Sequence, residues 1–62
     1  MKFNVGDRIV SKHNNETYEV KELPPTNLIV FPYPVYHLVN VKDGKVIYGK
    51  QDFVNEYYTL SN

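Results

Sequence analysis

The chain has 62 residues, and its seven basic and seven acidic side chains cancel to a formal net charge of zero. This length allows a single domain over residues 1–62, which buries only about 60% of the surface that its unfolded chain exposes. The charge balance lacks the basic excess with which non-specific nucleic-acid binders neutralise phosphates, and the absence of Cys excludes disulfides and thiolate zinc sites.

The first residues, 1–4, do not begin the apolar stretch of about 7–15 residues that a signal peptide requires. No run elsewhere approaches the roughly 20 apolar residues of a transmembrane helix. We therefore expect a soluble, cytoplasmic protein that does not enter a membrane.

Short alternating runs separated by turn residues predict an all-β fold from the start of the chain. The Gly6-Asp7 step is a turn signal, and a first strand is predicted over residues 7–11. We expect Val5 and Ile9 to face the core here, with Arg8 on the outer face.

The clearest strand signal covers residues 17–23, where apolar and polar residues alternate. Tyr18 and Val20 fall on one face, as in a half-buried antiparallel strand. Pro24-Pro25 ends this strand, because proline donates no hydrogen bond to a sheet. Residues 26–34 are apolar and rich in proline, and they fit either a short strand or an irregular loop over one end of the fold.

The second half of the chain contains a hairpin and a helical turn. Asp43-Gly44 is the strongest hairpin signal in the sequence, and Asp52 is the expected N-cap of the helical turn. The predicted elements are a strand over 35–41, its return strand over 45–48, a helical turn over 52–56 and a closing strand over 57–60.

The core of so small a domain needs large side chains, and six Tyr and three Phe are available to it. Without Cys, packing must hold the fold together, and self-association is left open as an aid. The residues expected to be buried are Val5, Ile9, Tyr18, Val20, Leu38, Val46, Phe53 and Leu60.

Two short segments resemble known small β-proteins. Phe3-x-Val5-Gly6-Asp7-x-Ile9 resembles the first strand of SH3-like modules in the KOW and Tudor-like group. Asp52-Phe53 followed by Glu56-Tyr57 is similar to the turn and closing strand of small phage and prophage accessory proteins of firmicutes. The resemblance implies a five-stranded antiparallel SH3-like barrel with one short helical turn before the last strand.

The chain departs from two SH3-like subfamilies whose ligands are known. Signalling SH3 domains use a Trp to hold Pro-rich peptides, and this chain has no Trp. The KOW modules of ribosomal proteins and transcription factors are usually basic, whereas this chain is neutral. The resemblance therefore indicates a fold more than a ligand.

No residue pattern indicates an enzyme. His13 and His37 lie far apart in the sequence, without further ligands at zinc-site spacing. The acidic residues are scattered singly, and Ser11 and Ser61 lack the sequence context of a nucleophile. We expect no catalytic residue, no cofactor and no metal site.

The segment Phe31-Pro32-Tyr33-Pro34-Val35-Tyr36 exceeds what a simple connection needs. In one interpretation, Phe31 and Tyr36 plug the ends of the fold while the prolines stiffen the chain. In the other, Phe31 and Tyr33 stand exposed on a stiff loop and form a patch that binds a partner. The two interpretations of the segment stay open, and for Tyr33 and Phe31 we predict substantial exposure on a partner-binding surface.

A second candidate surface surrounds the predicted turn at Asn14-Asn15. Arg8, Lys12 and His13 lie beside this turn in the predicted fold. They fit either contacts to a phosphate backbone or, more simply, a solvated strand end.

These observations favour a small intracellular binding module, an accessory protein of phage or prophage type that docks on a protein partner through residues 28–36 and the neighbouring sheet edge. The candidate partner-binding residues are Phe31, Tyr33, Tyr36, Arg8 and Lys12. The alternative is a nucleic-acid-associated module whose tyrosines stack on bases. Its phosphate contacts would come from Arg8, Lys12, Lys42, Lys45 and Lys50.

Overall fold

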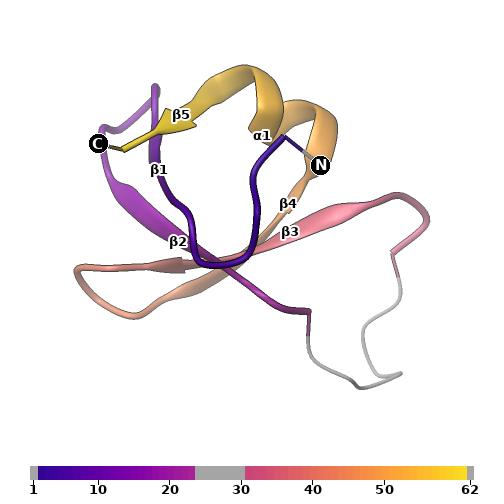
Figure 1. Ribbon diagram of the computed structural model, residues 1–62, viewed down its shortest axis with the longest axis horizontal. Helices are drawn as coiled ribbons and strands as arrows, with labels where there is room; N and C mark the ends of the chain where they lie inside the picture. Colours follow the sequence, from indigo (N-terminus) through magenta and orange to yellow (C-terminus); the bar gives the residue numbers. More distant parts are fainter. Residues whose placement is uncertain (1, 24–30, 62) are drawn as a thin grey trace.

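The computed structural model describes residues 2–23 and 31–61, which form one antiparallel sheet and one short helix (Figure 1). The elements are β1 (Arg8–Ser11), β2 (Thr17–Lys21), β3 (Val35–Asn40), β4 (Val46–Lys50), α1 (Gln51–Tyr57) and β5 (Tyr58–Leu60). The prediction of five antiparallel strands with a single short helix before the last strand is confirmed.

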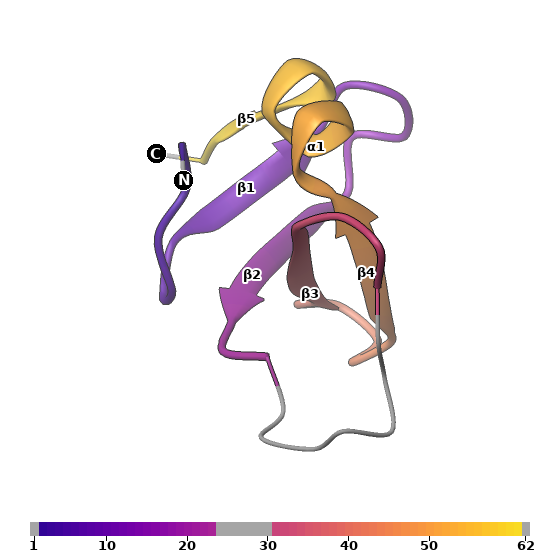
Figure 2. The same cartoon turned by 90° about the vertical axis from the view of Figure 1, so that its right-hand side faces the viewer.

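The strand order in the sheet is β4-β3-β2-β1-β5. β1 to β4 are joined as successive hairpins, and β5 returns to pair with β1 on its other side. In the figures, α1 and β5 lie together at one end of the molecule (Figures 1 and 2). Within the described residues β4 and β5 are not paired with each other, so closure of the sheet into a barrel stays a prediction.

The turns between strands use the residues that their backbone angles require. Gly44, between β3 and β4, has a φ of 76°, and Asn15, between β1 and β2, has a φ of 59°. Such positive φ angles favour Gly and are tolerated by Asn. Before β1, the side chain of Asp7 accepts a hydrogen bond from the backbone N–H of Asn4 at 2.9 Å. The turn signals at these positions are therefore confirmed.

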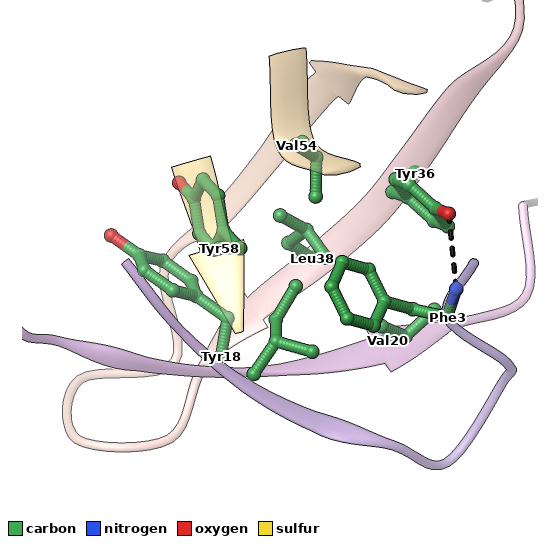
Figure 3. Close-up of a cluster of buried hydrophobic side chains, with 8 residues drawn as sticks. Phe3, Tyr18, Val20, Tyr36, Leu38, Val54 and Tyr58 are labelled. Atoms are coloured by element: carbon green, nitrogen blue, oxygen red, sulfur yellow. Dashed lines mark hydrogen bonds between the residues drawn. The ribbon is translucent and has the colours of Figure 1, made fainter. Parts of the chain in front are cut away.

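The hydrophobic core lies on the inner face of the sheet, below α1 (Figure 3). Alternation along β2 and β3 turns every second side chain of these strands toward it. The buried cluster consists of Phe3, Ile9, Tyr18, Val20, Tyr36, Leu38, Val54 and Tyr58. The predicted burial of Ile9, Tyr18, Val20 and Leu38 is confirmed.

Four residues expected in the core are instead about half exposed, namely Val5 at 55%, Val46 at 48%, Phe53 at 47% and Leu60 at 52%. Val5 lies in the turn before β1, and Leu60 is the last residue of β5, at the end of the sheet. Val46 pairs with Val39 and shares its face, which is opposite to that of Leu38. None of these positions is covered by the core.

The helix differs from its prediction in its bounds, in its N-cap residue and in the residue that it buries. It begins one residue early and ends one residue late, and Lys50, not Asp52, occupies the N-cap position, without a side-chain hydrogen bond. Val54 points into the core (Figure 3), so its neighbour Phe53 lies on the outer side of the helix. In a helix of two turns, adjacent apolar residues do not reveal which one is buried.

Gly49 in β4 lets α1 approach the sheet closely. A Cβ atom built on Gly49 would lie 2.6 Å from Cγ2 of Val54, a buried and branched side chain that has little room to withdraw. Gly49→Ala should therefore destabilise the fold by about 1–3 kcal/mol through overpacking, which urea unfolding would measure. The control Lys50→Ala, at the adjacent exposed position, should stay within about 0.5 kcal/mol of the parent. Equal stability of Gly49→Ala and the parent would contradict this packing.

Candidate binding surface

Four rings contact one another in series on the sheet face that points away from the core; we call them the aromatic cluster. It consists of Phe31, Tyr33, His37 and Tyr48. His37 in β3 and Tyr48 in β4 are directly opposite in the strand register, and their ring centroids lie 5.0 Å apart. Cross-strand ring pairs of this kind stabilise a sheet and stiffen the surface that they form.

The cluster extends from the sheet to the segment before β3. The ring of Phe31 lies 5.5 Å from that of Tyr48, and the ring of Tyr33 lies 6.3 Å from that of Phe31. The ammonium group of Lys50 lies 5.1 Å from the centroid of Tyr33. This distance is within the range of a cation–π contact, so the exposed end of the cluster carries a positive charge.

Exposure within the cluster is graded. Tyr33 is 42% exposed, as predicted, whereas Phe31 is half-buried against Tyr48. Residues 31–34 are not in a strand, which settles that part of the segment left open by the sequence; residues 24–30 lie outside the described residues. Tyr33 is thus the cluster member most accessible to a partner.

A hydrogen bond fixes the orientation of His37. Its Nδ1 lies 2.8 Å from the backbone carbonyl oxygen of Glu22. A carbonyl oxygen can only accept a hydrogen bond, so Nδ1 of His37 carries a proton and is the donor of this hydrogen bond. In the neutral ring Nε2 is then a hydrogen-bond acceptor next to Tyr48, which adds a polar contact point to the cluster.

A cleft of about 440 Å³ adjoins the cluster at His37. Its size falls within the range of about 300–1,000 Å³ that is typical of ligand pockets. Its lining combines apolar and polar side chains and consists of Val5, Val20, Lys21, Glu22, Leu23, Val35, Tyr36, His37 and Gln51. His37 is the residue that the cleft and the aromatic cluster have in common.

Tyr36 lines the cleft but is not a member of the aromatic cluster, and it is too buried to serve as a partner-binding residue, contrary to the sequence-based expectation. It is only 1% exposed. Its hydroxyl accepts a hydrogen bond from the backbone N–H of Phe3 at 3.1 Å (Figure 3). The same hydroxyl donates a hydrogen bond to Oδ1 of Asn55 at 2.8 Å. Tyr36 thus closes one end of the core and ties the N-terminal segment to α1, which leaves nothing of it for a partner.

Arg8 and Lys12 also lie apart from the aromatic cluster, because β2 separates β1 from β3. Nε of Arg8 is 3.9 Å from Oε1 of Glu19, and Nζ of Lys21 is 2.8 Å from Oε2 of the same carboxylate. The hydrogen bond and charge of Lys21 lower the pKa of Glu19. Nζ of Lys12 donates to the backbone carbonyl of Glu56 at 3.3 Å. Arg8 and Lys12 therefore each have a partner within the fold.

The remaining lysines of the nucleic-acid alternative do not converge. Lys42 and Lys45 lie at the turn between β3 and β4, whereas Lys50 lies at the far end of β4. At about 3.3 Å per residue, Lys45 and Lys50 are roughly 17 Å apart along the strand. The structure thus spreads these charges over two ends of one hairpin.

A second group of rings lies at α1. The ring of His13 is 4.9 Å from that of Tyr57 and 5.9 Å from that of Phe53, nearly parallel to the latter. The ring centroids of Phe53 and Tyr57 lie 4.6 Å apart. Phe53, which the sequence placed in the core, here covers the predicted turn of His13. This group offers an exposed aromatic residue for comparison with Tyr33.

Sequence reasoning missed His37 and Tyr48 as members of a surface. Each is a single aromatic or imidazole residue in a predicted strand, and alternation alone assigns it to a face without naming its neighbours. Their contact depends on the register of β3 against β4. The signal that could have drawn attention to them is that each places a ring at an outward position of its strand.

Comparisons with protein-family models, with characterised proteins and with solved structures found no match to this chain. The likeness to SH3-like modules and to phage accessory proteins therefore stays a prediction. Within residues 2–23 and 31–61, no group of three or more His, Asp or Glu side chains is placed to hold a metal ion. No helix among these residues is both long and apolar enough to cross a membrane.

Proposed function

We propose that this protein is a small binding module that docks on a protein partner through the aromatic cluster and the adjoining cleft. The observation that carries the proposal is the series of ring contacts from His37 to Tyr33 on the face of the sheet that the core does not use. Apolar groups gathered on a surface tend to mark interaction sites. Tyrosine is also enriched among the residues that dominate binding energy.

The stiffness of the cluster supports the same proposal. Pro32 and Pro34 flank Tyr33, and proline fixes one backbone angle. The rings of Phe31 and Tyr48 hold one another in place at 5.5 Å. A surface that is ordered before binding loses less conformational entropy when a partner docks.

The wider role follows from the sequence resemblance. Asp52-Phe53 and Glu56-Tyr57 are similar to segments of small phage and prophage accessory proteins. We infer an intracellular accessory role of this kind, in an SH3-like barrel that acts by binding and not by catalysis.

A second candidate function is binding of single-stranded nucleic acid. The contact between Lys50 and Tyr33 favours it, because such sites combine cations with rings on which bases stack. The other cations argue against it, since Arg8 and Lys12 have partners elsewhere. Retardation of a single-stranded DNA that weakens steeply as salt is raised would favour this candidate over protein docking.

Tyr33→Ala tests the proposed function. Once a partner has been captured from a lysate and purified, this variant should bind it at least about 30-fold more weakly, as expected for a central interface tyrosine. Its melting temperature should stay close to that of the parent, because Tyr33 is 42% exposed. Titration calorimetry and thermal unfolding would measure the two effects.

Phe53→Ala is the matched control, since Phe53 is an aromatic residue of similar exposure, 47%, in the other group of rings. It should bind the partner as the parent does. Unchanged binding by Tyr33→Ala, or equal losses in both variants, would contradict docking through the cluster. A large loss of stability in Tyr33→Ala would show that Tyr33 serves the fold.

A further inference from the structure

Among the described residues, one edge of β4 is open. β4 is the last strand in the sheet order, and in the part of the chain that the structure describes it pairs only with β3. Asn40 N–H donates to the carbonyl of Lys45 at 2.8 Å, and Gln51 N–H donates to the carbonyl of Pro34 at 3.0 Å. These two hydrogen-bonded pairs lie at the two ends of β4. They determine which residues between them direct their backbone groups toward β3 and which direct them away from it.

In an antiparallel pair, every second residue directs its peptide N–H and C=O away from the partner strand. Counting from the bracketing pairs, the residues of β4 that do so are Val46, Tyr48 and Lys50. A row of such groups is a template for pairing with another extended chain. The open row includes Tyr48, the residue that carries the aromatic cluster onto β4.

The side chains along this edge favour an extended ligand with apolar residues at alternate positions. Val46 is 48% exposed and lies on the same face as Tyr48. A strand added beside β4 would direct every second side chain to this face. Those side chains would lie next to Tyr48 and within reach of Phe31, which contacts it.

The charges at the edge indicate whether β4 would pair with a second copy of this chain or with a different partner. The uncharged residues 46–49 are bracketed by Lys45 and Lys50, and neither lysine forms an ion pair with a described residue. Antiparallel pairing of two β4 strands would gather four ammonium groups along one edge. Lysine on an edge strand opposes pairing with a second copy.

We propose that the open edge of β4 takes up an extended, acidic segment of a partner protein as an additional strand. Carboxylates near the two ends of the segment face Lys45 and Lys50, and an apolar side chain between them lies on Tyr48. This inference rests on the proposed function and names the kind of partner that the aromatic cluster serves. Main-chain hydrogen bonds to β4 supply much of the affinity, and the cluster supplies selectivity.

Two synthetic peptides test the charge requirement. Both alternate Val or Phe with Thr over four central residues, matching the four residues between Lys45 and Lys50; one has Asp at each end and the other has Lys. The Asp peptide should bind about fivefold more tightly at low salt, with amide NMR shifts centred on Val46 and Tyr48. The double variant Lys45→Glu/Lys50→Glu should reverse the preference. Equal affinity for both peptides, or no binding of either, would overturn the proposal.

Val46→Pro tests the edge itself. Because the N–H of Val46 points away from β3, this change removes a donor from the open edge and none from the β3–β4 ladder. Binding of the Asp peptide should be lost, and thermal unfolding checks that the variant folds; the charge-reversed variant serves if it does not. A parent that is dimeric by light scattering and becomes monomeric on this change would overturn the proposal in favour of a second copy.

The two proposals fail in different ways. If Tyr33→Ala loses the purified partner while Val46→Pro and the charge-reversed variant retain it, the cluster docks a partner without strand addition, and this inference is wrong. If Tyr33→Ala retains the partner, the proposed function is wrong.

Discussion

Leu38→Ala is expected to leave much of the protein unfolded at room temperature. Leu38 is fully buried at the centre of the cluster that joins β2, β3 and α1 (Figure 3). Truncating a buried leucine costs about 2–5 kcal/mol, because apolar contacts are lost and a cavity is left. A single core in a chain this short rarely supplies more than about 3–5 kcal/mol of net stability. The loss is therefore comparable to the whole free energy of unfolding.

Urea unfolding followed by circular dichroism would measure this loss. Val46→Ala is the control, because Val46 lies one register position away on the opposite face of the same hairpin and is 48% exposed. It should cost less than about 1 kcal/mol. A Leu38→Ala variant that melts within a degree or two of the parent would place the core elsewhere. Equal losses of stability in the two variants would mean that Val46 also faces the core.

The predictable part of this fold is local. Alternation at Tyr18 and Val20 marks the second strand, and both residues are buried as expected. The turn residues Asn15 and Gly44 have the positive φ angles that their types favour. These signals depend on a few neighbouring residues, which is why they can be interpreted without knowledge of the rest of the chain.

The burial of Tyr36 could have been predicted from the same alternation. The sequence predicts that Leu38 lies in the core, and residues two apart in a strand share a face. In a strand over residues 35–41, Tyr36 therefore points inward with Leu38. The prolines at 32 and 34 draw Tyr36 into the candidate binding segment 28–36, although the predicted strand and β3 both begin at Val35.

The contact between His37 and Tyr48 could not have been predicted, because it depends on long-range register. A two-residue turn at Asp43-Gly44 would place residue 42 opposite Lys45. In the structure Asn40 lies opposite Lys45 instead. The backbone carbonyl of Lys45 accepts a hydrogen bond from the backbone N–H of Asn40, and the side-chain Oδ1 of Asn40 accepts one from the backbone N–H of Lys42. A longer turn, stabilised by Asn40, shifts every pairing along β4 by two residues. The aromatic cluster is a consequence of that shift.

Tyr36→Ala and Tyr36→Phe should destabilise the protein to different extents, which separates the packing of this ring from its hydrogen bonds. Loss of the whole buried ring should cost about 3–5 kcal/mol and prevent stable folding. Tyr36→Phe keeps the ring against Phe3, whose centroid is 5.8 Å away. It removes only the hydroxyl that accepts from Phe3 N–H and donates to Asn55.

The cost of Tyr36→Phe should be about 1–3 kcal/mol, since the buried N–H of Phe3 then has no acceptor. Tyr33→Phe is the matched control: it removes the same hydroxyl from a tyrosine that is 42% exposed, and it should change stability by less than about 0.5 kcal/mol. Hydrogen exchange of the Phe3 amide gives a local measurement, and its protection should fall in Tyr36→Phe alone. If both variants unfold like the parent and this amide stays protected, Tyr36 does not hold the N-terminal segment against α1, and a role for it at the surface would have to be considered again.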